Sequence, residues 1–254
     1  MGLLATLLRL LVGVVVCGVI CAFFFPLCIV LLPSRRLRIR LCNGFGKVLG
    51  RTLLRVCGVT VDDRVAQQLE AMKPAIFVTN HASILDIFAG IWLAPYDTCG
   101  VAKKEVIWYP FFGLVYLVSG HLRVDRGNRA SAVEGMRATA ALMKQHGLGA
   151  WIWPEGTRAK DGRLLPFKKG FAHLALATGL PVVPVILEGA HRIWPRTELR
   201  IHPGPLGLKV LPAIPTASWS VDTLDAHIAE VRQAFVDALP EDQKPRAEAV
   251  VGVA

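Results

Sequence analysis

A histidine and an aspartate near each other in the sequence, His81 and Asp86, are the residues of this chain best suited to acid–base chemistry. They lie in the segment 80–86, which reads Asn-His-Ala-Ser-Ile-Leu-Asp, between a predicted strand at 75–79 and a predicted helix at 84–94. An aspartate that orients an imidazole makes the histidine a general base for a hydroxyl nucleophile. Residues five apart point about 140° away from each other on a helix, so the pair meets only if His81 precedes the helix. A surface or N-cap role also fits this spacing.

A second polar segment, Glu155-Gly156-Thr157-Arg158, follows the apolar strand predicted at 150–153 after one proline. A glycine lets a ligand approach the backbone, and a threonine offers a hydroxyl. An arginine offers a planar fork that suits phosphate or carboxylate. The segment therefore suits an anionic ligand, and the alternative is a β-turn with an exposed arginine.

Two further predicted strands end in cations. Lys104 follows the strand at 99–102 after another lysine, and Arg126 follows the strand at 121–124. Each group by itself is typical of a solvated charge. Open α/β sheets place their ligands at the carboxyl ends of strands, and four polar groups in such positions indicate more together than any one alone.

The elements that position these residues alternate between strands and helices. Further strands are predicted at 182–187 and 206–211, and further helices at 129–146, 169–178 and 221–238. This alternation predicts an α/β fold, with a single domain over 58–254 whose mostly buried mixed sheet is flanked by helices. The residues after Pro240 are polar and then small, and we expect them to be poorly ordered.

The amino-terminal part of the chain has the composition of a membrane anchor. Residues 10–33 carry no charge, and as a helix these 24 residues would span roughly 36 Å, more than the hydrocarbon core of a bilayer, about 30 Å. The apolar run is longer than that of a secretory signal and ends in bulky residues before a basic stretch, so we expect an uncleaved anchor over 1–33. Pro26 removes a backbone donor, and the helix either kinks there or turns back within one leaflet.

Seven basic residues and no acidic ones lie within 34–55, whereas only Arg9 and the amino terminus precede the anchor. The positive-inside rule therefore places everything after residue 34 in the cytoplasm. On a helix over 34–57 the basic residues occupy one side and leucine, valine and phenylalanine the other, which is typical of a helix in the membrane interface. A helix that packs on its own domain is the alternative.

Composition and charge restrict the class of partner. The chain has 254 residues, 53% of them hydrophobic and 19% charged, which excludes a disordered chain. Of the net charge of +10, only +2 remains for the 199 residues after 55, so the excess charge favours a membrane surface over nucleic acid. The six cysteines show no C-x-x-C pair and no metal-ligand spacing with histidine, and we interpret them as small buried hydrophobes.

Together these segments resemble the glycerophospholipid acyltransferase family, and most closely its bacterial 1-acyl-sn-glycerol-3-phosphate acyltransferase branch. The segment 80–86 matches the family's N-H-x-S-x-x-D block in full, and 155–158 matches its E-G-T-R block. Lys104 resembles the lysine of the segment between the first two blocks, and 181–185 matches the proline-punctuated fourth block. One block differs from the usual G-x-x-F-I-D-R, because Arg123 stands where the family has phenylalanine.

The resemblance implies an O-acyltransferase in which His81 takes the proton from an acceptor hydroxyl and Asp86 orients His81. That hydroxyl attacks the thioester of acyl-coenzyme A or of acyl carrier protein, so the resemblance implies neither an enzyme nucleophile nor a metal or other cofactor. Asn80 and Glu155 would fix the loops of the site. Five residues would bind the acceptor phosphate or let it approach: Lys104, Arg126, Gly156, Thr157 and Arg158.

The implied acceptor is lysophosphatidic acid, acylated at its sn-2 hydroxyl to phosphatidic acid on the cytoplasmic side of a bacterial-type inner membrane, as a step of phospholipid biosynthesis. Arg123 lies in a block that helps bind the acceptor in the family, so a lyso-ornithine lipid or another lysophospholipid is an alternative acceptor. A catalytically silent lipid-binding scaffold has no chemical need for His81 and Asp86. Three further histidines match no motif, and we interpret them as structural: His121, His173 and His191.

Overall fold

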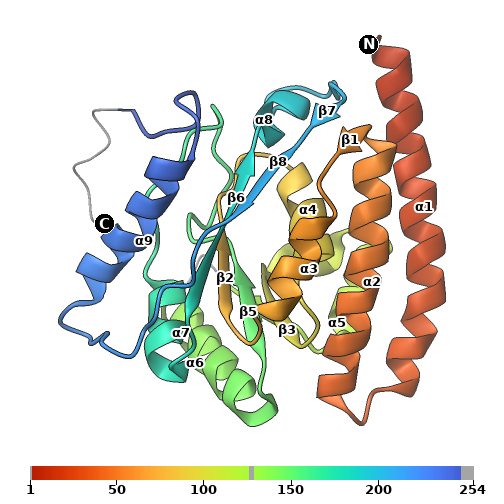
Figure 1. Cartoon of the computed structure of the whole chain (residues 1–254). Helices are drawn as coiled ribbons and strands as arrows, with labels where there is room; N and C mark the ends of the chain where they lie inside the picture. Colours follow the sequence, from red (N-terminus) through yellow and green to blue (C-terminus); the bar gives the residue numbers. More distant parts are fainter. Residues whose placement is uncertain (1, 126–128, 247–254) are drawn as a thin grey trace.

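The central sheet contains both parallel and antiparallel strand pairs. The computed structural model describes residues 2–125 and 129–246, and within them the strand order is β4-β3-β5-β2-β6-β8 (Figure 1). The strands are β2 (Ile76–Thr79), β3 (Thr98–Lys103), β4 (Leu122–Val124), β5 (Gly149–Ile152), β6 (Val182–Glu188) and β8 (Gly207–Val210). Neighbours from β4 to β6 pair in parallel and β8 runs antiparallel to β6, so the predicted mixed sheet is confirmed. The proposed phosphate ligand Arg126 lies outside the described residues.

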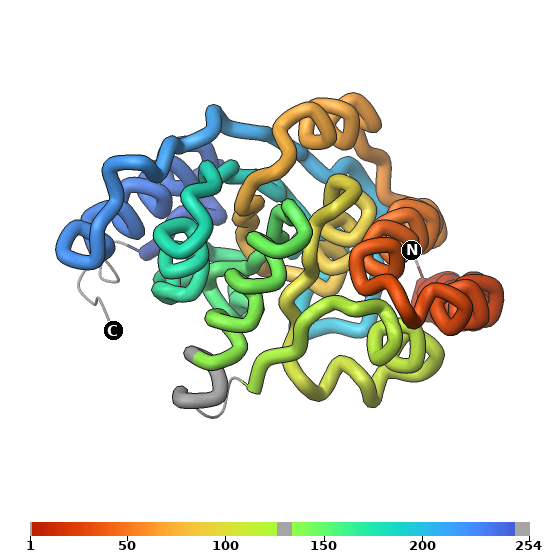
Figure 2. Tube along the Cα trace, turned by 90° about the horizontal axis from the view of Figure 1, so that it is seen from below, coloured from red at the N-terminus to blue at the C-terminus, as the bar shows by residue number. Residues whose placement is uncertain are grey.

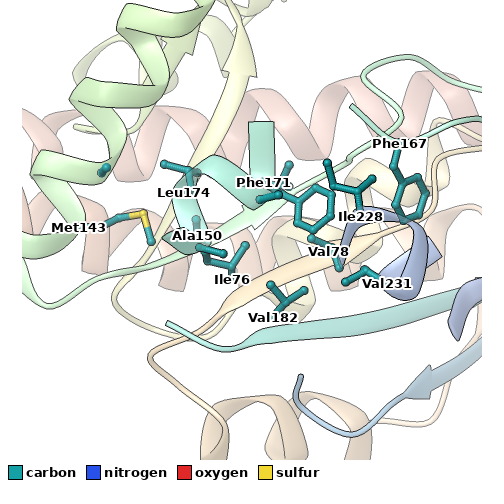
Figure 3. Close-up of a cluster of buried hydrophobic side chains, with 14 of the residues drawn as sticks. Ile76, Val78, Met143, Ala150, Phe167, Phe171, Leu174, Val182, Ile228 and Val231 are labelled. Atoms are coloured by element: carbon teal, nitrogen blue, oxygen red, sulfur yellow. The ribbon is translucent and has the colours of Figure 1, made fainter. Parts of the chain in front are cut away.

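Helices cover both faces of this sheet (Figures 1 and 2). One face carries α6 (Arg129–His146), α7 (Gly170–Thr178) and α9 (Leu224–Ala238), and the other carries α2 (Arg35–Val56), α3 (Arg64–Ala71) and α4 (Leu85–Leu93). Successive side chains of a strand point to opposite faces, so β2 contributes to both cores. Ile76 and Val78 join the cluster of Figure 3 with Phe171 and Val231, whereas Phe77 stacks on Trp151 on the other face.

The strands and helices predicted beyond residue 58 all form, with ends that differ by a few residues. The sequence pattern did not reveal several short elements, because they contain too few residues for a period to show. These elements are β1 (Val59–Thr60), α3, the 3-10 helix η1 (Lys104–Trp108), α5 (Phe112–Val118), α8 (Ala190–Ile193) and β7 (Gly204–Pro205). Two of them, η1 and α5, connect β3 to β4 beside the amino-terminal helices.

The apolar amino-terminal segment forms one helix, α1 (Leu3–Val30), which continues through Pro26. The chain turns back at residues 31–33 and not at the proline, and α2 then runs antiparallel to α1 (Figure 1). The two ends of the hairpin show this direction: Arg9 Nη1 donates to Val56 O at 2.6 Å, and Cys28 Sγ lies 3.5 Å from Cys42 Sγ. Among the described residues, α1 is the one helix long and apolar enough to cross a membrane.

Helix α2 packs closely on α4 through two glycines. A Cβ atom on Gly46 would lie 2.6 Å from Ile91 O, and one on Gly50 would lie 2.3 Å from Phe88 O. Any larger side chain would push the helices apart, which explains why residues with low helix propensity occur within α2. The neighbouring leucine Leu54 is fully buried in the same contact layer.

On its apolar side, α2 fits the alternative interpretation, in which the helix packs on its own domain. Phe45 and Leu49 are buried between α1 and α5. Its basic residues bind acidic groups of the domain: Arg36 and Arg40 contact Asp97, Lys47 contacts Glu70, and Arg51 contacts Asp63. Protein therefore covers part of the apolar face of α2, including Phe45, Leu49 and Leu53, whereas Leu37 and Val48 remain about half exposed. Where α2 lies relative to a membrane stays a prediction.

The segment after α9 is ordered where the structure describes it, so the expectation of a poorly ordered tail is wrong for residues 241–246. Gln243 is fully buried, and its side chain accepts a hydrogen bond from Gly189 N at 2.7 Å. The composition of this segment is polar, but a buried, hydrogen-bonded polar side chain can hold a segment in place. The prediction for residues 247–254 lies outside the described residues.

Candidate active site

His81 and Asp86 are in contact at the carboxyl end of β2. The strand ends at Thr79 and α4 begins at Leu85, so His81 lies in the loop ahead of the helix, as contact requires. Its Nδ1 atom is 3.1 Å from Asp86 Oδ2. A carboxylate accepts from a protonated Nδ1, and the other nitrogen of the neutral ring, Nε2, then carries the lone pair. This arrangement leaves Nε2 able to accept a proton.

Asp86 is held in place by the backbone of its own loop. Its side chain is 1% exposed, and Oδ2 also accepts hydrogen bonds from Ala82 N at 2.5 Å and Ser83 N at 2.6 Å. Asp86 lies in the first turn of α4, where the helix dipole favours a negative charge. These contacts fix the carboxylate so that it orients the imidazole with little freedom.

Glu155 connects the loop after β5 to the backbone of His81. Its residue is 3% exposed; Oε1 accepts from His81 N at 2.6 Å, and Oε2 accepts from Leu165 N at 2.8 Å. Ala159 N in the same loop donates to His81 O at 2.8 Å. Both main-chain groups of His81 are therefore bound by the loop 155–165. Burial raises the pKa of the Glu155 carboxyl to about 8.

The raised pKa of Glu155 makes stability depend on pH. Its contribution is fully present below the unfolded pKa of 4.5 and is lost as the pH rises through about 8, where the folded carboxyl loses its proton. Between about pH 5 and pH 9 we expect the free energy of unfolding of the wild type to fall relative to that of Glu155→Gln, which cannot ionise. Urea unfolding of both proteins across this range measures the difference. Curves that stay parallel would argue against the raised pKa.

Asn80 fixes the loop on its other side. Its Nδ2 donates to Leu187 O at 2.9 Å and its Oδ1 accepts from Leu187 N at 2.8 Å, both buried. The asparagine thus extends the pairing of β2 with β6 by one residue, using its side chain where the strand has ended. His81 is held between β6, through Asn80, and the loop after β5, through Glu155.

A cavity of about 690 Å³ opens beside His81. Its walls are mainly apolar side chains of α1, α2, α4 and α5, and Trp153 lies with its ring centre 5.3 Å from that of His81. Gly156, Thr157 and Arg158 line the cavity together with His81, so these four predicted residues share one site. A mainly apolar cavity with some polar and charged groups in its lining suits a molecule with an acyl chain and a charged head.

Not all of the predicted residues face this cavity. Lys104 binds Asp125 at 2.6 Å and lies with Arg123 and Trp108 at a separate surface hollow. This ion pair raises the pKa of Lys104. The neighbouring Lys103 is the lysine that lines the cavity of His81. Sequence spacing alone did not distinguish the two, because β3 ends at Lys103 and η1 begins at Lys104.

The backbone conformation at residue 156 requires a glycine. Its φ of +69° lies in the left-handed region, and a Cβ atom there would be 3.0 Å from the Lys168 side chain. An L side chain in this conformation costs about 1–2 kcal/mol. The glycine thus shapes the turn that presents Thr157 and Arg158 to the cavity.

Comparison with known proteins assigns this chain to a family. A family model described as Acyltransferase matches residues 60–188, half of the chain, including both His81 and Glu155. The chain belongs to the acyltransferase family. This acyltransferase is 43% identical over 217 residues to 1-acyl-sn-glycerol-3-phosphate acyltransferase of Limnanthes douglasii, with 85% of this chain and 76% of that one covered. The enzyme of the same name from Escherichia coli K12 is 32% identical over 205 residues, covering 80% of this chain and 82% of that one.

The fold of this acyltransferase also has a solved counterpart. The crystal structure of the 1-acyl-sn-glycerophosphate (LPA) acyltransferase PlsC from Thermotoga maritima superposes with a TM-score of 0.73 at 22% identity. The match covers 93% of this chain and 95% of that chain, so it includes the amino-terminal helices as well as the sheet.

Three residues at the cavity of this acyltransferase were not singled out from the sequence. Lys103 and Arg196 add positive charge to its lining, and Arg196 donates to Arg158 O. Trp153 adds the aromatic ring beside His81. The sequence contained signals for two of these residues, since Lys103 belongs to a lysine pair at the end of a strand and Trp153 precedes the segment 155–158. Arg196 belongs to no local motif and reaches the cavity from the chain after α8.

Proposed function

We propose that the chain transfers a fatty acyl group to the sn-2 hydroxyl of lysophosphatidic acid, giving phosphatidic acid. The observation that carries the proposal is the His81–Asp86 contact of 3.1 Å at the wall of a mainly apolar cavity of about 690 Å³. The relatives whose printed names state this activity cover most of the chain, at 43% and 32% identity. The reaction places this protein in phospholipid biosynthesis.

His81 acts as the general base. Its Nε2 takes the proton of the acceptor hydroxyl as the oxygen attacks the thioester carbonyl, and the departing thiolate is then protonated by the imidazolium. Asp86 stabilises the imidazolium during the transfer. The acceptor itself supplies the nucleophilic oxygen, so His81 and Asp86 account for the proton transfers without a covalent acyl-enzyme.

The charged groups near His81 bind the two phosphorylated substrates. Thr157 and Arg158 contact the acceptor phosphate, with Lys103 and Arg196 adding positive charge at the same cavity. The apolar walls receive an acyl chain. The donor is an acyl thioester of coenzyme A or of acyl carrier protein, which serves as a co-substrate and not as a cofactor.

An acceptor panel tests this function directly. Purified protein with radiolabelled acyl-coenzyme A should acylate lysophosphatidic acid at least about tenfold faster than lysophosphatidylethanolamine or a lyso-ornithine lipid, because a bound phosphomonoester gains charge-assisted hydrogen bonds. A preference for one of the other acceptors would support the alternative suggested by Arg123 and would overturn the assignment of the acceptor.

The amino-terminal helix attaches the protein to the cytoplasmic face of the inner membrane by lying along one leaflet. The amino-terminal end of α1 is bound to the catalytic domain, where Ile201 N donates to Thr6 Oγ1 at 3.3 Å, and the other end contacts α2 through Cys28 and Cys42. Helix α1 also packs on α5 of the domain. If α1 crossed the bilayer, the domain packed along it would have to enter the hydrocarbon core. An exposed apolar stripe follows the whole helix: Leu4, Leu8, Leu11, Val15, Val19, Phe23 and Val30.

Charges on this stripe should release the protein from membranes. Leu11 and Val19 are 62% and 65% exposed, and an aspartate in hydrocarbon costs about 2.5–3.5 kcal/mol on the insertion scale. For the variant carrying Leu11→Asp and Val19→Asp, we expect the vesicle-bound fraction to fall at least about tenfold in a sedimentation assay. Val221→Asp, at a residue 75% exposed before α9, is the matched control and should stay bound. Equal binding of all three proteins would refute the placement of α1.

A further inference from the structure

The glutamine Gln243, in the segment after α9, is fully buried and makes four hydrogen bonds within the described part of the chain, one of them from its main-chain N–H to Pro240 O at 2.9 Å. Its Oε1 accepts from Gly189 N at 2.7 Å, and its Nε2 donates to Leu187 O at 3.3 Å. Its main-chain oxygen accepts from Leu164 N at 2.8 Å. Gln243 therefore joins the end of β6 to the loop that follows β5, two segments far apart in the sequence.

The first of these links leads directly to the residue before His81. Leu187 O accepts from Gln243 Nε2 and also from Asn80 Nδ2, and Leu187 N donates to Asn80 Oδ1. A carbonyl oxygen has two lone pairs, so both donors can be satisfied together. A shift of the backbone at Leu187 would move Asn80 and, with it, His81.

The second link leads to the amide of His81. Leu164 is bound to the main chain of Gln243, and the next residue, Leu165, donates its N–H to Glu155 Oε2. The other oxygen of Glu155 accepts from His81 N at 2.6 Å. Two residues hold His81 in place, Asn80 and Glu155. Gln243 is linked to Asn80 through Leu187, and to Glu155 through the adjacent residues Leu164 and Leu165.

We propose that Gln243 is a positioning residue for His81, one that sets the distance between the end of β6 and the loop 155–165. Neighbouring ion pairs hold the segment in place: Asp242 binds Arg192, and Arg163 Nη1 donates to Lys244 O at 2.9 Å. A buried amide is suited to the position because Gly189 N needs an acceptor and Leu187 O can take a second donor. Gln243 lies beyond the region matched by the family model, 60–188. The inference rests on the proposed role of His81.

Replacing Gln243 with methionine keeps the side-chain length and removes both side-chain hydrogen bonds. Because small displacements of a catalytic group reduce the rate strongly, we expect kcat to fall about 10- to 100-fold with KM for both substrates changed less than about twofold. Amide hydrogen exchange should rise in peptides covering 79–84 and 160–167, and not in α2. Gln233→Met, on the exposed side of α9, is the matched control and should keep the wild-type kcat.

Gln243→Glu gives a second test that does not depend on tolerance of methionine. A protonated carboxyl can donate to Leu187 O and a carboxylate cannot, so kcat relative to the wild type should fall as the pH rises. A kcat within twofold of the wild type in Gln243→Met, a flat relative profile in Gln243→Glu, or exchange raised equally throughout the protein would each overturn the positioning role. If His81→Ala is fully active, the proposed function fails as well; if it is inactive while the Gln243 variants are normal, only this inference fails.

Discussion

Replacing His81 with alanine should lower kcat for acyl transfer to lysophosphatidic acid by about 10²- to 10⁴-fold, the range that a general base contributes. The imidazole of His81 lies beside the cavity, and Asp86 binds its Nδ1 at 3.1 Å, so Nε2 of the neutral ring can take the hydroxyl proton. Steady-state initial rates with a radiolabelled acyl donor measure the effect. KM should change little, because the ring acts on the proton in the transition state and not on the bound substrates.

The same substitution should leave the fold and membrane binding intact. The main-chain N–H and C=O of His81 bind Glu155 and Ala159, and alanine keeps both groups. His173→Ala is a suitable control because His173 lies exposed on α7 and has no predicted catalytic role. Vesicle sedimentation and thermal unfolding should be alike for the three proteins. A His81→Ala variant as active as the control would refute the role of the base.

The second large effect is expected for Asp86→Asn. Asparagine has the same shape but no charge, so it cannot stabilise the imidazolium that forms when His81 takes the proton, and by analogy with other His-Asp sites kcat should fall by up to about 10⁴-fold. Its amide would also face buried surroundings, since Asp86 Oδ1 has no hydrogen-bond partner. That unsatisfied donor should lower the free energy of unfolding by about 1–3 kcal/mol.

The kinetic and structural effects of Asp86→Asn can be separated. Activity is measured at a temperature well below the unfolding midpoint, so the folded variant is the species assayed. Asp63→Asn is the matched control, since Asp63 is 62% exposed, pairs with Arg51, and such a surface pair contributes about 0–1 kcal/mol. The control should retain wild-type kcat. If Asp86→Asn retained it too, Asp86 would serve the loop structure alone.

Local sequence patterns were sufficient to predict the sheet and the contact between the two residues proposed for catalysis, His81 and Asp86. The strands at 75–79, 150–153 and 182–187 are short apolar runs, and their parallel pairing places the residues that follow them at one edge. This is why His81 and the segment 156–158 share a cavity. The His81–Asp86 contact depended on one condition, a loop position for His81, which the start of α4 at Leu85 satisfies.

The surroundings of α2 could not be predicted from its own residues. A basic amphipathic helix shows the same periodicity whether its apolar face meets lipid or protein. The contacts that decide this are long-range. Gly50 packs against Phe88 O, Asp97 pairs with Arg40, and Glu70 pairs with Lys47. Only the pairing of distant segments reveals that α1 presents a long exposed apolar stripe, whereas protein covers much of the apolar face of α2.

Long-range contacts also explain what the motifs missed at the site. Lys103 and Lys104 are adjacent in the sequence but lie at different hollows, because β3 ends there and η1 begins. Gln243 belongs to a segment whose polar composition indicates a loose tail, yet its amide lies buried between β6 and the loop 155–165. A motif describes neighbours along the chain, and these residues act on neighbours across the fold.

The most direct test of the account is the formation of radiolabelled phosphatidic acid from lysophosphatidic acid, followed in the same vesicles for the wild type and His81→Ala. The wild type should produce phosphatidic acid with the label at the sn-2 position, and His81→Ala should produce it at least about 10²-fold more slowly while remaining bound to the vesicles. No phosphatidic acid from the wild type, or equal rates for the two proteins, would contradict the assignment of this chain as an acyltransferase that uses His81 as its base.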